Sequence, residues 1–92
     1  MVKTNFDKLV KEITVFEIKS GFTQTPKTRL VAWLKKEIKH YLTAKTKSEK
    51  ANKLADIIVL ALQLARRDKL SLDSAWKAWW QKSRKYLIVR KR

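Results

Sequence analysis

The chain has 92 residues, and its 23 lysines and arginines against 8 aspartates and glutamates give a formal net charge of +15. It has no cysteine, one histidine and one glycine, which excludes a disulfide framework, a thiolate or histidine-rich metal site and a glycine-rich phosphate loop. The charge favours an anionic partner, such as nucleic acid, a nucleotide or lipid headgroups. Because 45% of the residues are hydrophobic, we expect one folded domain over residues 1–92 rather than a disordered tail.

The first residues lack the apolar segment of a signal peptide. The longest uninterrupted apolar run, residues 57–62, is far too short to cross a bilayer. We therefore expect a soluble, cytoplasmic protein. A chain of this size forms only a marginal core alone, so we also expect a homodimer that buries further apolar surface.

Apolar residues at helical spacing predict a first helix over residues 4–19 and a second over residues 27–44. Gly21 is suited to end the first helix, and Pro26 to begin the second. Most of the second helix surface is basic. We expect one apolar stripe of this helix to be buried, with Trp33 at its edge. The stripe consists of Leu30, Val31, Leu34, Ile38, Tyr41 and Leu42.

A third helix is predicted over residues 48–67, with Ser48 as its N-cap. Within residues 54–65 only Asp56 and Gln63 are polar. A helix that is apolar on nearly every side has to be covered on nearly every side, so we expect the other helices to pack around it. A carboxylate such as Asp56 in this run needs a partner, a metal ion or a raised pKa.

Ser71 begins a second capping signal, and a fourth helix is predicted over residues 72–85. We expect its tryptophans to lie in core or dimer contacts rather than to stack on bases. Residues 86–92 are a basic tail, which either extends the fourth helix or packs across a dimer. Together these elements predict an all-α fold, a small four-helix bundle.

Two pairs of polar residues are expected to meet between the second and third helices. Glu37 and His40 are three residues apart, as are Lys53 and Asp56, so the members of each pair share a helix face. The short connection makes the two helices antiparallel, with each pair about two turns from it. We therefore expect all four side chains in one cleft.

Five segments of this sequence, in order and spacing, resemble the MazG-type all-α nucleoside triphosphate pyrophosphohydrolases, and most of all their small phage and prophage branch that acts on purine deoxynucleotides. The family pattern is Glu-x-x-Glu, a connection, and Glu-x-x-Asp inside an apolar helix. The resemblance implies a helical bundle whose acids hold Mg²⁺ and activate water, releasing nucleoside monophosphate and pyrophosphate. The segments that carry it are residues 21–29, 34–40, 53–62, 69–75 and 82–86.

Only two of the four family acids are present, at Glu37 and Asp56, because His40 and Lys53 occupy the other positions. Lysine in place of glutamate changes the charge by two units and opposes a nearby magnesium ion by several kcal/mol at an effective dielectric constant of about 20. We therefore favour a degenerate, non-catalytic MazG-like protein that binds phosphate-bearing ligands. The residues expected to bind nucleic-acid or nucleotide phosphates are Lys36, Lys39, Lys53, Lys82, Arg84, Lys85, Arg90, Lys91 and Arg92.

Two alternative functions stay open. An active Mg²⁺-dependent pyrophosphohydrolase would use Glu37, Asp56 and His40 as metal ligands. A cationic, tryptophan-rich membrane-surface protein would use the fourth helix, but mutual burial explains the apolar helix faces better, so a membrane partner is not expected. Asp56 and Lys53 are also open to a purely structural interpretation, as a neutralised ion pair.

Overall fold

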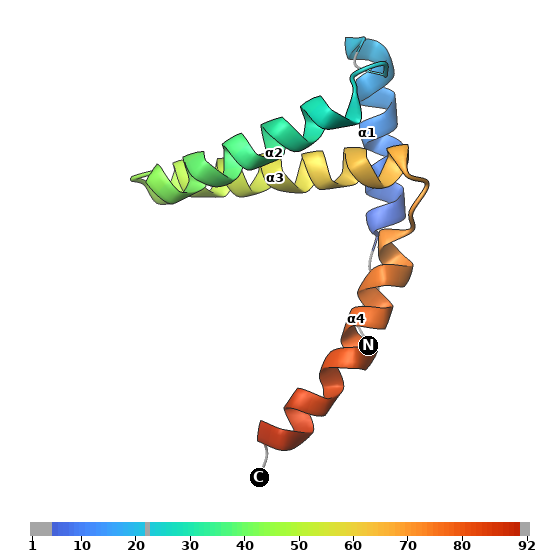
Figure 1. Cartoon of the computed structure of the whole chain (residues 1–92), viewed down its shortest axis with the longest axis vertical. Coiled ribbons are helices and arrows are strands. Elements are labelled where there is room, and N and C mark those ends of the chain that lie inside the picture. Colours follow the sequence, from blue (N-terminus) through green and yellow to red (C-terminus); the bar gives the residue numbers. More distant parts are fainter. Residues whose placement is uncertain (1–4, 22, 91–92) are drawn as a thin grey trace.

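The computed structural model is all-helical, and we describe residues 5–21 and 23–90 of it, with side chains up to residue 85. The described chain contains four helices and no strands, which confirms the predicted all-α class (Figure 1). The predicted helix start at Thr4 lies outside the described residues. The helices are α1 (Phe6–Ser20), α2 (Lys27–Thr43), α3 (Lys47–Arg67) and α4 (Leu72–Arg90).

Local signals set most helix ends. Gly21 ends α1 with a φ of 77°, in the left-handed region that glycine tolerates. The prediction of Ser48 as the N-cap of α3 is wrong. Thr46 takes that place because its hydroxyl accepts from the Glu49 N–H at 3.1 Å and the Glu49 carboxylate accepts from the Thr46 N–H at 3.0 Å. This reciprocal pair is a capping box, which requires the acid three residues after the cap.

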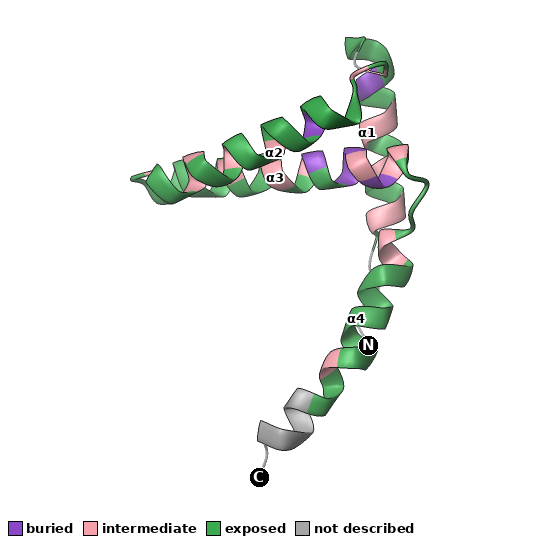
Figure 2. Cartoon of the chain, viewed as in Figure 1, coloured by how far each residue is buried: buried purple, intermediate pink, exposed green. Residues whose placement is uncertain are grey.

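Helices α2 and α3 form an antiparallel hairpin, and α1 crosses the hairpin where α2 begins and α3 ends (Figure 1). The buried residues gather at that crossing (Figure 2). The apolar members of this small core are Leu30, Leu60, Leu62 and Ala65.

The expectation that α3 is covered on nearly every side is wrong for the single chain, because Leu54 and Ile58 are exposed. The buried stripe predicted on α2 also needs correction, since Val31, Ile38 and Leu42 are exposed. The physical reason is that α4, which could have covered them, instead contacts α1 and points away from the hairpin (Figure 1).

Helices α1 and α4 are joined at their first turns. The Asp73 carboxylate accepts hydrogen bonds from the backbone N–H groups of Phe6 at 2.8 Å and Asp7 at 3.2 Å. The Ser71 hydroxyl donates to the Asp7 carboxylate at 2.9 Å and accepts from the Ser74 N–H at 3.2 Å. The predicted capping signal at Ser71 is thus confirmed, and these bonds satisfy amide groups that a helix start leaves unpaired.

A buried acid links α1 to the end of α3. Glu17 is fully buried and accepts hydrogen bonds from the Gln63 side chain at 3.2 Å and from the Arg66 guanidinium. Arg67 lies 3.9 Å from the same carboxylate and donates to the backbone carbonyl of Thr25. The network therefore holds α1, α3 and the loop before α2 together.

Helix α4 runs to Arg90, so residues 86–90 of the predicted tail continue the helix. The tail residues Lys91 and Arg92 and the side chain of Arg90 lie outside the described part of the structure. In the described residues, no helix is both long enough and apolar enough to cross a membrane.

Candidate functional site

The four polar side chains predicted to meet do lie in one pocket of about 470 Å³ between α2 and α3. Glu37 and His40 come from α2, and Lys53 and Asp56 come from α3. The short connection after Thr43 turns the chain back on itself, so that two residues from each side of the turn face each other. The predicted juxtaposition is confirmed. The pocket is lined by Trp33, Lys36, Glu37, His40, Lys53, Asp56, Val59 and Leu60.

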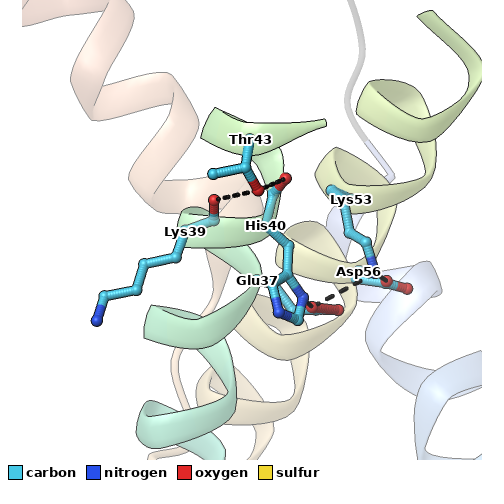
Figure 3. A network of polar contacts seen from close by, with 6 residues as sticks. All are labelled: Glu37, Lys39, His40, Thr43, Lys53 and Asp56. Carbon is cyan, nitrogen blue, oxygen red and sulfur yellow. Dashed lines mark hydrogen bonds and ion pairs between the residues drawn. The ribbon is translucent and has the colours of Figure 1, made fainter. Parts of the chain in front are cut away.

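The Lys53 ammonium lies close to both carboxylates (Figure 3). Its Nζ atom is 3.6 Å from Glu37 Oε1 and 3.9 Å from Asp56 Oδ2. His40 Nδ1 is 2.9 Å from the same Glu37 oxygen. Lys53 thus forms an ion pair with an acid on each helix, from the position where the family pattern has a glutamate.

Glu37 and Asp56 have opposite pKa shifts. Burial, a hydrogen bond with Glu37 and the negative charge of Glu37 raise the pKa of Asp56, against a lowering effect of Lys53. Burial would also raise the pKa of Glu37, but hydrogen bonds with Asp56 and His40 and the charge of Lys53 together outweigh it and lower that pKa. As the pH falls, Asp56 is therefore the first of the two carboxyls to take up a proton.

These shifts predict opposite effects of neutralising the two acids. The stability that comes from Asp56 is present below its usual pKa of 3.8 and is lost as the pH rises through its raised folded value. The stability from Glu37 is present above its usual pKa of 4.5 and is lost as the pH falls through its lowered folded value. At neutral pH, Asp56→Asn should therefore stabilise the fold, and Glu37→Gln should destabilise it.

Thermal unfolding followed by circular dichroism over roughly pH 3 to 8 measures both effects. Because the Asp56 side chain is 51% exposed, we expect a change below about 1 kcal/mol for Asp56→Asn. Destabilisation of the same sign by both substitutions at neutral pH would contradict the assignment.

The donor set of the pocket fits Mg²⁺ poorly. Magnesium prefers oxygen ligands, and the pocket offers two carboxylates, one imidazole and two competing ammonium groups. Among the described residues, no group of three acidic, histidine or cysteine side chains is arranged to hold a metal ion. Glu37, His40 and Asp56 as metal ligands remain a prediction from the sequence.

The predicted phosphate-binding residues fall into separate groups. Lys36 and Lys53 line the pocket, whereas the Lys39 side chain points away from the cluster (Figure 3). The group on α4 is exposed and lies on a helix that leaves the hairpin (Figure 1). Its described members are Lys82, Arg84 and Lys85.

The sequence pattern puts Trp33 at the edge of a buried stripe, but the structure places it in the pocket wall. Its position four residues before Glu37 puts both side chains on one face of α2, so the spacing could have indicated this. Trp33 gives the pocket an aromatic surface beside its charged groups.

Comparison of the chain with protein-family models, with curated proteins and with solved structures found no match. The resemblance to the MazG-type family therefore remains a prediction from the sequence segments that carry it.

Proposed function

We propose that the chain is a degenerate, non-catalytic MazG-like protein that binds phosphate-bearing ligands, nucleic acid or nucleotides, through its basic surface. The observation that carries this proposal is the Lys53 ammonium paired with both Glu37 and Asp56, at 3.6 and 3.9 Å. In a MazG-type site a divalent cation neutralises these acids. A lysine there supplies a fixed positive charge but has no coordination sites with which to position and activate water.

The pocket itself suits a small anionic ligand. Its volume of about 470 Å³ lies within the range of about 300–1,000 Å³ typical of small-molecule sites. Lys36 and Lys53 provide positive charge for phosphate oxygens. Trp33 provides a face on which a base can stack.

The net charge of +15 supports binding to a polyanion such as nucleic acid. Such binding depends on neutralising phosphates and releasing counterions. The logarithm of the binding constant therefore falls linearly with the logarithm of the salt concentration. We expect labelled single-stranded DNA and a fluorescent dATP analogue to bind in the presence of EDTA, as measured by fluorescence anisotropy at several salt concentrations.

The double variant Lys82→Gln/Arg84→Gln tests the α4 group. It should weaken DNA binding and make the salt dependence shallower, by about 0.7–0.9 in slope for each phosphate that the variant no longer neutralises. The matched control is Lys8→Gln/Lys11→Gln, which removes the same charge from exposed positions on α1. Equal effects of the two double variants would show that net charge, and not the α4 surface, determines binding.

Absence of catalysis is tested separately. We expect no pyrophosphate release from dATP or dGTP with either Mg²⁺ or Mn²⁺. Metal-dependent release that Asp56→Asn abolishes would instead establish the second candidate, an active pyrophosphohydrolase. That candidate is favoured by one observation, the opposite pKa shifts of Glu37 and Asp56 beside His40, since carboxyl pairs with separated pKa values are typical of acid–base sites.

The exposed tryptophans of α4 favour a third candidate, attachment to a membrane surface. It requires binding to vesicles of anionic lipid. Failure to co-sediment with such vesicles at low salt would remove it.

A further inference from the structure

The chain exposes much more surface than a compact chain of its mass. Its accessible surface is 7710 Å², against about 5,600 Å² for a compact monomer of this size. Its radius of gyration is 15.8 Å, against about 12 Å. The excess of roughly 2,000 Å² from each of two chains would fall within the range that permanent dimers bury.

Part of this excess is an apolar face on the α2–α3 hairpin. Glu37 on α2 and Lys53 on α3 meet across the hairpin at 3.6 Å. Tyr41 and Ile57 follow them by four residues and so share their helix faces, and all four are partly buried. The position after each of these four carries an apolar residue. Val31 likewise follows the buried Leu30. We call this set of residues the hairpin apolar face. Its members, which are 38–73% exposed, are Val31, Ile38, Leu42, Leu54 and Ile58.

Helix geometry puts all five on one side of the hairpin. Each step of one residue along an α-helix rotates the side-chain direction by about 100°. Because the two helices are antiparallel, the residue that follows a contact residue points to the same side of the hairpin on both helices. One residue back leads to the opposite side, where the pocket residues Lys36, His40 and Asp56 lie. The hairpin therefore has a charged side with the pocket and an apolar side without a cover.

The chain's own α4 is directed away from this face. Its first turn is fixed to α1 by the hydrogen bonds from Phe6 and Asp7 to Asp73, and from there α4 extends away from the hairpin (Figure 1). Covering the hairpin apolar face with α4 of the same chain would break this junction.

Helix α4 carries a second uncovered apolar surface, formed by Trp76, Trp79 and Trp80. The ring centroids of Trp76 and Trp79 are 5.5 Å apart and stacked, and Trp80 meets Trp79 edge-on at 5.2 Å. The three side chains are 38%, 47% and 39% exposed. Beside them lies an apolar hollow of about 260 Å³, lined by Phe6, Leu72, Ala75, Trp76 and Trp79.

We infer that a second copy of the chain covers both surfaces, with the tryptophan face of each α4 packed on the hairpin apolar face of the other chain. The two surfaces lie on different parts of one chain, so a two-fold axis pairs each with its complement and closes the assembly at two chains. Helix α4 has 19 residues and α2 has 17, about 28 and 25 Å, so α4 is long enough to lie along the hairpin. This dimer does not depend on the proposed phosphate binding.

Salt separates the dimer from phosphate binding. Each chain carries a net charge of +15, so two copies repel each other, and added salt screens that repulsion. Self-association should therefore tighten as salt increases, whereas binding to nucleic acid weakens.

Cysteine cross-linking tests the contact directly, because the chain has no cysteine of its own. A chain with Ile58→Cys mixed with a chain with Ala75→Cys should give a heterodimer with a short bismaleimide. Asn52→Cys mixed with Ala75→Cys should not, because Asn52 is exposed on the opposite side of α3. Equal cross-linking from Asn52→Cys and Ile58→Cys would overturn the assignment of faces.

Light scattering tests the assembly. The wild-type chain should have twice the 10.9 kDa chain mass. Ile58→Glu should weaken self-association by about 30-fold or more, and Asn52→Glu, which adds the same charge on the opposite side, should not. Circular dichroism shows whether the Ile58→Glu chain stays helical, as its exposed position predicts.

A wild-type chain that is monomeric at about 100 μM would overturn the inference, since permanent dimers of this interface size associate far more tightly. So would a dimer that Ile58→Glu leaves intact while the chain stays folded. A monomer that binds anionic vesicles would assign the apolar surfaces to a membrane instead.

Discussion

Glu17→Gln is expected to destabilise the fold by about 3–5 kcal/mol, because it breaks a buried ion pair by removing one partner. The carboxylate is fully buried and accepts from Gln63 and Arg66, with Arg67 at 3.9 Å. Without its charge, two arginines at the end of α3 keep their positive charges in a partly buried site. That leaves two partly buried cations at the junction of α1 and α3 without the carboxylate that they face.

Urea unfolding followed by circular dichroism measures the loss. Domains of this size are stable by about 5–15 kcal/mol, so the expected change is a large share of the total. Glu12→Gln is the matched control, since it removes the same charge from an exposed position on α1, and it should change stability by no more than about 0.5 kcal/mol. A Glu17→Gln protein as stable as the Glu12→Gln control would show that the network contributes nothing.

Lys53→Glu is expected to convert the pocket into a divalent-metal site. It replaces an ammonium 3.6 and 3.9 Å from two acids with a third carboxylate. Each unit of charge at about 4 Å from a divalent ion changes the interaction by about 8 kcal/mol at an effective dielectric constant of 20 before the cost of desolvation, so Mn²⁺ affinity should rise by about 1,000-fold or more over the wild-type chain. Isothermal titration calorimetry with Mn²⁺ measures this gain.

The control for this experiment is Lys50→Glu, which makes the same charge change at an exposed position of α3 outside the pocket. It should leave Mn²⁺ affinity close to that of the wild-type chain. Without metal, three carboxylates in one pocket repel each other, so Mn²⁺ should also raise the unfolding temperature of the Lys53→Glu protein. If the wild-type chain bound Mn²⁺ as tightly as the Lys53→Glu chain, Lys53 would not be the group that opposes a metal ion in the pocket.

The helices could be predicted from the sequence because their signals are local. Apolar spacing, Gly21 and Ser71 act within one or two turns of the residues that they organise. The predicted N-cap of α3, Ser48, is two residues late, because both Thr46 and Ser48 are residues that favour caps. The position of Glu49 decides between them, since only Thr46 precedes it by three residues.

The pocket could also be predicted, because it needs only two adjacent helices and a short connection between them. The Glu17 network could not, since its partners Gln63 and Arg66 lie 46 and 49 residues further along the chain. A single acid on a helix of mixed charge gives no sign that it is buried.

The direction of α4 depends on the hydrogen bonds from Phe6 and Asp7 to Asp73, which lies 67 and 66 positions further along the chain. Local sequence patterns therefore carry no information about that direction. The apolar periodicity of α3 shows that its surface requires a cover. It does not show whether another helix of the chain provides that cover, and Leu54 and Ile58 are exposed because α4 does not.

The capped junction between Asp73 and the start of α1 sets the direction of α4. The 19-residue helix extends about 26 Å beyond Asp73, so a change of roughly 10° in its direction at the junction would move the far end by about 4.5 Å. The same junction belongs to α1, whose Glu17 is anchored in α3. The junction with α4 is therefore connected through α1 to the base of the hairpin, while the pocket lies further along that hairpin.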